Sequence, residues 1–427
     1  NKRLTMIKHL LKIIWHQRRS NGWIFAELLV VLATVWTMLD AYWVDFRTYH
    51  APMGVDITNV WRFKLSSLNE HAPNYVPASE YTSSEPEDLL KLMDQIRRYP
   101  MVEEVCVTYY SCPYSNGNSW WGLIPLDGDT AVASQQSFQV RRVTPEYFDV
   151  FRIKDTGGKS ITAALEEAHN PIVITQTMED IFYHGESGKG RRVIMDHSTD
   201  EVLNIAAVCP AIRATEYQRA EPCYYHVLKG ATFNTFVEYF NASSAELCVR
   251  MKKEYTKEEM NGILSDMGDL LTVNNLNVYG VQSLKEKRGT MLSYQEDEAR
   301  QKLSIMLFLL ANVFFGVIGT FWLRTQSRRG EMGLRVALGA TRVSIRRFMY
   351  LEGLCLLMLT IIPVLIYALN MMYLDKLDSY RIPLGMGRFL ITFSATYLLM
   401  AGMICLGIWY PVSRASKMAP AESLHYE

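Results

Sequence analysis

The sequence predicts a multi-pass α-helical membrane protein with four spans, both termini in the cytoplasm, and a large α+β domain outside the membrane. Four segments stay apolar over the roughly 20 residues that a helix needs to cross a bilayer. Lysines and arginines gather at alternate ends of these segments, as they do in cytoplasmic loops. Residues 45–301, between the first two apolar segments, are enough for a large domain.

These observations divide the chain into nine segments. They are an amphipathic cytoplasmic helix (1–20), a first span (21–44), an extracytoplasmic domain (45–301), a second span (302–324), a cytoplasmic segment (325–347), a third span (348–374), a short outer loop (375–388), a fourth span (389–411) and a cytoplasmic tail (412–427).

The first segment carries apolar residues at helical spacing from Ile7 to Trp15, with basic residues on the other face. This pattern predicts a helix lying on the cytoplasmic membrane surface. The following span has the basic flank of a secretion signal, but it is long, and Asp40–Asp45 offers no small-x-small cleavage site. We therefore expect an uncleaved signal anchor. Whether the native start lies upstream of Asn1 or at Met6 stays open.

Two ionisable residues, Glu27 and Glu352, were identified within the spans. Charge in lipid is expensive, so such residues are functional candidates. Each lies near a cytoplasmic end, which favours a structural role reaching headgroups or neighbouring arginines. Gly316 and Thr320 in the second span have the spacing of close helix packing. Pro363 predicts a kink in the third span.

The two ends of the outer domain have matching layouts. Ser84 with Glu87, and Thr256 with Glu259, form capping boxes that each open a helix with one apolar face. A predicted strand lies on either side of each helix. Two such βαβ units indicate a split ferredoxin-like subdomain (45–110 and 245–283), with a β-rich subdomain inserted at about 111–244 and a helical stalk at about 284–301.

The cytoplasmic segment between spans two and three is the most informative part of the chain. From Arg324 to Arg347 it holds seven arginines and one acid, which topology alone could explain. Its distinctive residues are Arg328, Arg329, Glu331, Gly333, Arg335, Gly339, Ala340 and Thr341. This pattern resembles the coupling segment of MacB/FtsX-type ABC transporter permeases. The resemblance implies that these residues dock on a separate ATPase subunit, and that the amphipathic N-terminal segment is an elbow helix. Thr341 is expected to cap the third span's helix.

A second block extends the resemblance into the outer domain. Val143–Phe151 resembles the V-[ST]-P-x-Y-F-x-V element of MacB-like periplasmic core domains, followed by strands at Ile172–Thr175 and Val202–Val208. The chain departs from the family at Ile153–Gly158, where a Gly-Arg pair is usual. The resemblance implies a porter-like subdomain interrupted by a smaller one. It also implies a second permease chain, identical or paralogous, packed through spans one and two, where Gly316 and Thr320 lie.

Several chemistries lack their motifs. Gly158-Lys159-Ser160 ends like a P-loop, but Ile153 stands where the first glycine is required. We therefore expect no enzyme activity, no catalytic residue, no metal and no cofactor, with ATP and magnesium bound by the partner ATPase. A net charge of zero argues against nucleic-acid binding.

The five cysteines of the outer domain permit Cys106–Cys112 or Cys209–Cys223 disulfides, but their odd number favours mostly free, buried thiols. Trp120 and Trp121 fit a core pair slightly better than a partner-binding tip.

The functional hypothesis is a permease subunit of the cell inner membrane, with its large domain in the periplasm. The resemblance implies mechanotransmission, in which ATP hydrolysis on the partner ATPase moves the periplasmic domains of the permease. The expected result of this movement is export or efflux of a substrate. A periplasmic adaptor and an outer-membrane channel are further possible partners. Two alternatives share this architecture: an FtsX-like regulator of a periplasmic hydrolase and a lipoprotein-releasing permease. The substrate is not readable from the sequence.

Overall fold

The computed structural model describes residues 18–115, 119–133, 136–195, 201–327, 330 and 339–415. The chain forms two compact units, Asn1–His50 with Gln295–Glu427, and Ala51–Tyr294. We describe each unit by itself. The predicted amphipathic helix lies outside the described residues except for 18–20, as does the tail after Ala415.

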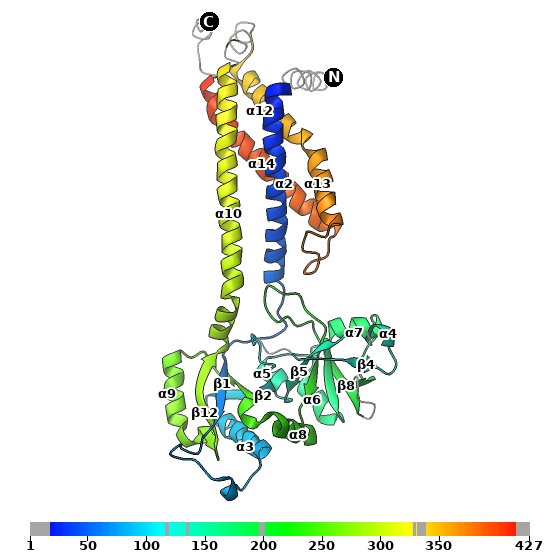
Figure 1. The fold of residues 1–427 in the computed structure, drawn as a ribbon, viewed down its shortest axis with the longest axis vertical. Helices are drawn as coiled ribbons and strands as arrows, with labels where there is room; N and C mark the ends of the chain where they lie inside the picture. Colours follow the sequence, from blue (N-terminus) through cyan, green and yellow to red (C-terminus); the bar gives the residue numbers. More distant parts are fainter. Residues whose placement is uncertain are drawn as a thin grey trace. The chain divides into compact units, whose positions relative to one another are not determined.

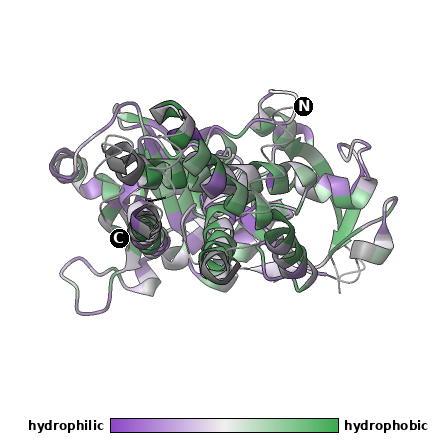
Figure 2. Ribbon diagram, turned by 90° about the horizontal axis from the view of Figure 1, so that it is seen from above, coloured by the Kyte–Doolittle hydropathy of each residue, from purple (hydrophilic) through white to green (hydrophobic). Residues whose placement is uncertain are grey.

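The first unit is a set of long helices (Figure 1). They are α2 (Arg18–Tyr49), α10 (Leu284–Ser327, which begins within the residues of the other unit), α12 (Arg342–Leu359), α13 (Ile361–Tyr373) and α14 (Met386–Ala415). Four stretches of the described residues are long and apolar enough to span a membrane, namely Gly22–Tyr49, Leu284–Thr320, Val343–Tyr373 and Met386–Trp409. In the hydropathy colouring of Figure 2, hydrophobic residues appear in green on several helices and strands. The prediction of four spans is confirmed.

The third span is interrupted as Pro363 predicted. Helix α12 ends at Leu359 and α13 begins at Ile361. Proline has no N–H to donate to the carbonyl four residues earlier, so the regular ladder cannot continue through it. At the end of α12, the Thr360 hydroxyl donates to the Leu357 carbonyl at 2.6 Å, and the Thr360 N–H donates to the same carbonyl at 3.1 Å.

One hydrophobic cluster holds this bundle together. Leu28 and Leu32 of α2 pack with Leu356 of α12 and Ile404 of α14, and Val313 of α10 joins them. Nearer the end of α2, the fully buried Trp36 makes edge-on ring contacts with Tyr367 and Phe389. The fold of this unit therefore rests on apolar contacts between helices that are distant in sequence.

The second unit is built on one mixed sheet. Its strands are β1 (Val60–Ser67), β2 (Val102–Tyr109), β3 (Trp120–Trp121), β4 (Leu123–Pro125), β5 (Phe138–Val143), β6 (Pro171–Thr175), β7 (Arg192–Met195), β8 (Val202–Cys209), β9 (Cys223–Val227), β10 (Glu246–Met251), β11 (Thr272–Val273) and β12 (Leu276–Ser283). Its helices are α3 (Glu85–Arg97), α4 (Thr130–Ala133), α5 (Tyr147–Val150), α6 (Ile161–Glu167), α7 (Gln176–Tyr183), α8 (Ala231–Phe240) and α9 (Lys257–Met267). The strand order is β11-β12-β1-β10-β2-β5-β9-β6-β8-β7-β4, with β3 paired to β5.

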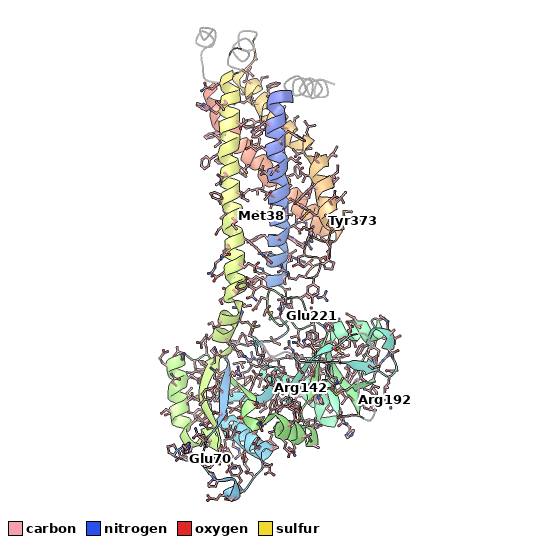
Figure 3. The ribbon with its side chains drawn as sticks, viewed as in Figure 1. Met38, Glu70, Arg142, Arg192, Glu221 and Tyr373 are labelled. Atoms are coloured by element: carbon pink, nitrogen blue, oxygen red, sulfur yellow. The ribbon has the colours of Figure 1, made fainter. Side chains whose placement is uncertain are left out.

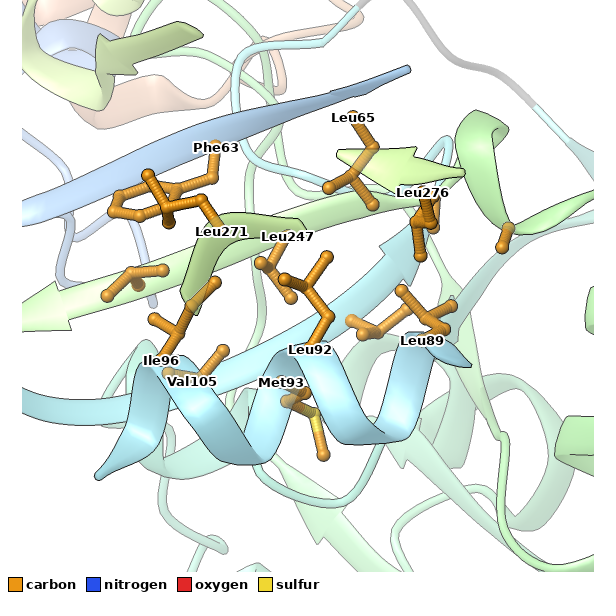
Figure 4. Packing of buried hydrophobic residues seen from close by; sticks show 14 of the residues in the cluster. Phe63, Leu65, Leu89, Leu92, Met93, Ile96, Val105, Leu247, Leu271 and Leu276 are labelled. Atoms are coloured by element: carbon orange, nitrogen blue, oxygen red, sulfur yellow. The ribbon is translucent and has the colours of Figure 1, made fainter. Parts of the chain in front are cut away.

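Strands β12-β1-β10-β2 are the split ferredoxin-like subdomain. Each strand is antiparallel to its neighbours, and α3 and α9 are the two crossover helices. Both predicted capping boxes form; the Glu87 carboxylate accepts from the Ser84 N–H at 3.0 Å, and the Glu259 carboxylate from the Thr256 N–H at 2.7 Å. Both helices cover one face of the sheet, since residues of α3 and α9 share a core cluster with the strands. Figure 4 shows Leu89, Leu92 and Ile96 of α3 packed against that face.

The insertion continues the same sheet. Strand β5 pairs with β2 at Thr108 and Val143 and runs parallel to β9. The strands expected at Ile172–Thr175 and Val202–Val208 are β6 and β8. One helix within the predicted insertion belongs with the other subdomain: Phe233 and Val237 of α8 lie in the core cluster of α3 and β1. The boundary of the ferredoxin-like core therefore includes α8, which the sequence had assigned to the insertion.

Candidate functional site: the cytoplasmic turn and the buried charges of the bundle

The end of the predicted coupling segment forms a capped helix start. Gly339 has φ +91°, a left-handed conformation that glycine adopts without steric cost. Ala340 follows, and the Thr341 hydroxyl accepts from the Ser344 N–H at 3.3 Å. The predicted cap is confirmed. Arg328, Arg329, Glu331, Gly333 and Arg335 lie outside the described residues.

The two acids identified within the spans have different surroundings. Glu352 of α12 is fully buried in the bundle, which favours a partner within the protein, one of the two alternatives, over lipid headgroups. Glu27 of α2 is only partly buried, and its carboxylate faces Gly316 of α10. A Cβ at Gly316 would lie 2.7 Å from Glu27 Oε1, closer than such contacts occur. Glycine therefore makes room for this carboxylate.

This contact lies within one chain. The Thr320 hydroxyl donates to the Gly316 carbonyl at 2.8 Å, one helical turn away. The expectation that Gly316 and Thr320 pack against a second permease chain stays a prediction.

A buried ion pair that sequence reasoning missed joins α2 to α14. Arg388 Nε donates to Asp40 Oδ1 at 3.0 Å and Nη2 donates to Oδ2 at 2.5 Å. Each side chain is only 3% exposed. The remaining nitrogen, Nη1, donates to the carbonyls of Asp378 and Ile382. Arg388 lies in the first turn of α14, where the helix dipole disfavours a cation, so the bidentate carboxylate offsets an otherwise costly placement.

A second arginine extends this connection to the outer loop. Arg381 Nη1 lies 2.6 Å from Asp45 Oδ1 of α2, and Arg381 Nε pairs with Asp378. Desolvation acts to raise the pKa of Asp378, but hydrogen bonds from Arg381 outweigh it and the pKa is lowered. Two arginines at the start of α14 and in the preceding loop therefore fasten this end of the bundle to α2.

In the outer unit, the Val143–Phe151 element forms the joint between the ferredoxin-like strands and the insertion. Thr144 exchanges two hydrogen bonds with the backbone of Val107 in β2. The fully buried Arg250 of β10 donates to the carbonyls of Val150, Thr58 and Asp56 at 2.5, 2.7 and 2.6 Å. The Val143–Phe151 element thus forms a structural joint in this unit.

The remaining candidates of the outer unit resolve differently. All five of its cysteines are free and buried, as favoured from their odd number. Burial raises the pKa of the Cys106 and Cys209 thiols, which makes them poor nucleophiles.

Trp120 and Trp121 are 50% and 43% exposed, so their interpretation as a core pair is wrong. Strand β3, only two residues long, cannot place both rings on one buried face.

No group of three or more His, Cys, Asp or Glu side chains in the described part of the chain is arranged to hold a metal ion. The candidate site instead consists of structural contacts of the helices. They are the capped start of α12 at Thr341 and the ion pairs of Arg381 and Arg388 with α2.

The C-terminal part of the chain matches a known protein family. Residues 303–420 match the FtsX-like permease C-terminal family. This part of the chain is similar to FtsX-like permease domains. The match includes the turn at Gly339–Thr341, Glu352 and the Asp40 partner Arg388. It confirms the resemblance predicted from the cytoplasmic segment. No curated protein matches the chain.

Several solved structures are similar to part of the chain. The periplasmic region of MacB from Actinobacillus actinomycetemcomitans is 11% identical, with a TM-score of 0.34, over 57% of this chain and 97% of that one. A domain of a putative permease from Porphyromonas gingivalis is 13% identical, with a TM-score of 0.32, over 53% and 89%. The extracellular domain of the transporter YknZ from Gram-positive bacteria is 12% identical, with a TM-score of 0.29, over 51% and 100%. Similarity at this level does not assign an activity.

Proposed function

We propose that the chain is the permease subunit of an ABC transporter of the MacB/FtsX type, working by mechanotransmission. The FtsX-like permease domain at residues 303–420 carries this proposal, because its cytoplasmic segment has the basic and glycine pattern of an ATPase-docking surface. ATP and magnesium belong to the partner ATPase, and the permease chain moves in response. Its large domain lies in the periplasm, with the spans in the inner membrane.

The bundle geometry supports force transmission from the docking segment. Thr341 caps α12 two residues after Gly339, so a displacement of the turn acts on an ordered helix start. Helix α12 is fixed to α2 and α14 through the cluster of Leu28, Leu356 and Ile404. Helix α2 is fixed in turn to α14 by Asp40 and Arg388. A push on α12 is therefore shared by helices of the whole bundle.

Two permease chains are required, since ABC ATPases act as pairs. The partner is a second copy or a close paralogue, and export or efflux is the direction that the domain organisation favours. A periplasmic adaptor and an outer-membrane channel complete the assembly in that case. The regulator of a periplasmic hydrolase is the second candidate, but the outer unit Ala51–Tyr294 is larger than such regulators need.

The proposal is tested by removing the docking charges. A Glu331→Ala/Arg335→Ala variant should lose co-purification of the ABC ATPase from membranes of the native host, while its melting temperature stays unchanged. The matched control removes one acid and one base elsewhere: Glu254→Ala/Lys285→Ala, an exposed pair 3.1 Å apart in the outer unit. Retention of the ATPase by the docking variant would contradict the proposal.

A further inference from the structure

The outer unit contains a cavity of about 280 Å³ beside a buried, uncompensated arginine. Its walls come from the loop after β2, from β5 and from the segment after β8, and include Ser111, Gln139, Arg141 and Arg213. Met53 and Val140 add apolar surface. The cavity is thus large enough for a small ligand and carries basic side chains.

Arg141 is 8% exposed, and its Nε is buried without a hydrogen-bond partner. Its neighbours are the Tyr147 hydroxyl, the Cys223 thiol and the ring of Tyr225, whose centroid lies 5.9 Å from the guanidinium carbon. Burial raises the pKa of each of these three groups, so all stay neutral at physiological pH. Within the described residues, no carboxylate forms an ion pair with Arg141.

A buried charge without a counter-charge is expensive, so proteins pair such groups or use them. The carboxylate that contacts the cavity-lining Tyr114 is paired with another arginine: Glu216 Oε1 lies 2.5 Å from Arg288 Nε and accepts from the Tyr114 hydroxyl. Arg213 donates to the carbonyls of Pro52 and Glu216 and so stays fixed at the wall. The residues that line the cavity include two arginines, Arg141 and Arg213, and no acid.

The cavity wall at residues 110–114 is also held in an unusual conformation. Tyr110 and Tyr114 have φ +52° and +57°, a left-handed conformation that costs free energy for residues other than glycine. The Glu246 carboxylate fixes the loop between them by accepting from the N–H groups of Ser111 and Cys112 at 3.0 and 2.9 Å. Such locally strained segments are concentrated at ligand-binding sites.

We propose that this cavity binds an oxyanion, a phosphate or carboxylate group on a small molecule, with Arg141 as its counter-ion. A guanidinium presents the fork that such groups accept bidentately. The same chemistry is found on soluble phosphates and on an anionic lipid headgroup. The apolar wall at Met53 and Val140 suits the carbon part of either ligand.

The test uses the full chain in a neutral, phosphate-free detergent and titration calorimetry with two probes, inorganic phosphate and dihexanoyl phosphatidic acid. Arg141→Gln should weaken binding by at least about tenfold, since a charge-assisted hydrogen bond is lost, and Arg141→Lys should retain part of it. Arg142→Gln, the next residue of β5 and labelled in Figure 3, is the matched control and should bind as the parent does.

The two probes separate the sources of the ligand. Binding of both points to the oxyanion alone, and binding of phosphatidic acid alone points to a lipid headgroup; either outcome supports the site. Loss of binding in Arg141→Gln must come with an unchanged or raised melting temperature, because an unpaired buried charge has been removed. Equal binding by Arg141→Gln and the parent, or no binding of either probe by the parent, would overturn the proposal.

Discussion

Asp40 and Arg388 lie 348 positions apart in the sequence and form a bidentate ion pair with both side chains almost fully buried. The pair connects α2 to the first turn of α14, at the end of the bundle where Arg381 pairs with Asp45. Charges so thoroughly removed from solvent are costly unless a counter-charge and hydrogen bonds compensate them. The two helices can therefore separate here only at the cost of exposing two buried ions.

Replacing one partner of this pair should destabilise the bundle strongly. For Asp40→Asn we expect a loss of about 3–5 kcal/mol, because the Arg388 guanidinium is left buried without its counter-ion. Differential scanning calorimetry of the detergent-solubilised chain measures this. Lys376→Gln, an exposed change in the outer loop, is the control. If Asp40→Asn melts at the parent's temperature, the pair is not the fastening that we describe.

The ion pair also shows where sequence reasoning stopped. Asp40 lies inside the predicted first span but was not recognised there as an ionisable residue, and Arg388 lies one residue before the predicted fourth span. Neither has a local signal, because the pairing is created by tertiary packing of distant helices. By contrast, the capping boxes at Ser84 and Thr256 are local patterns, and both helices formed as predicted.

In the outer unit too, features set by neighbouring residues could be predicted from the sequence, and features set by residues distant in the sequence could not. The ferredoxin-like strands followed from alternation and caps within short windows. The packing of α8 on α3, and the cavity at Arg141, depend on residues that only the folded sheet brings together. The exposure of Trp120 was missed because an aromatic pair has the same composition in a core and on an edge.

The cap of α12 should matter for order at the helix start more than for overall stability. Thr341→Ala removes the acceptor of the Ser344 N–H and should cost about 1 kcal/mol locally. Hydrogen exchange at the first-turn amides of α12 should therefore accelerate about fivefold, a factor that corresponds to this free energy. Thr341→Ser keeps the hydroxyl and should exchange like the parent. Unchanged exchange in Thr341→Ala would show that the cap does not stabilise the helix.

His226 of β9 should make the outer unit sensitive to acid. Desolvation, with a smaller contribution from Arg142, lowers the pKa of His226 from 6.5 to about 4. The unfolded chain binds this proton at higher pH than the folded chain, so the contribution to stability is complete above about pH 6.5. It is lost as the pH falls from 6.5 to 4, by at most about 3 kcal/mol for a shift of this size.

The measurement is the melting temperature of the full chain at pH 7.5 and pH 4.5. His226→Gln cannot bind the proton and should lose less stability between these two pH values than the parent does. His71→Gln changes an exposed histidine and serves as the control. Equal pH dependence in His226→Gln and the parent would contradict the assignment.

The last prediction concerns helix α10, which runs unbroken from Leu284 to Ser327. No proline or glycine occurs from Ser293 to Ala311, and Arg300 and Lys302 pair with acids one turn earlier, Glu296 and Glu298. If the outer unit is driven through this helix, its stiffness is required for transport. Inserting Gly-Ser after Arg300 should therefore leave ATP hydrolysis by the assembled transporter measurable but abolish the cellular phenotype.

An Ala-Ala insertion at the same place is the control. It shifts the helical register equally but keeps the helix, so a difference between the two insertions reports on the stiffness of α10. We expect it to retain partial function. Transport that survives the Gly-Ser insertion, or is lost equally with Ala-Ala, would show that a rigid α10 is not how this chain conveys force.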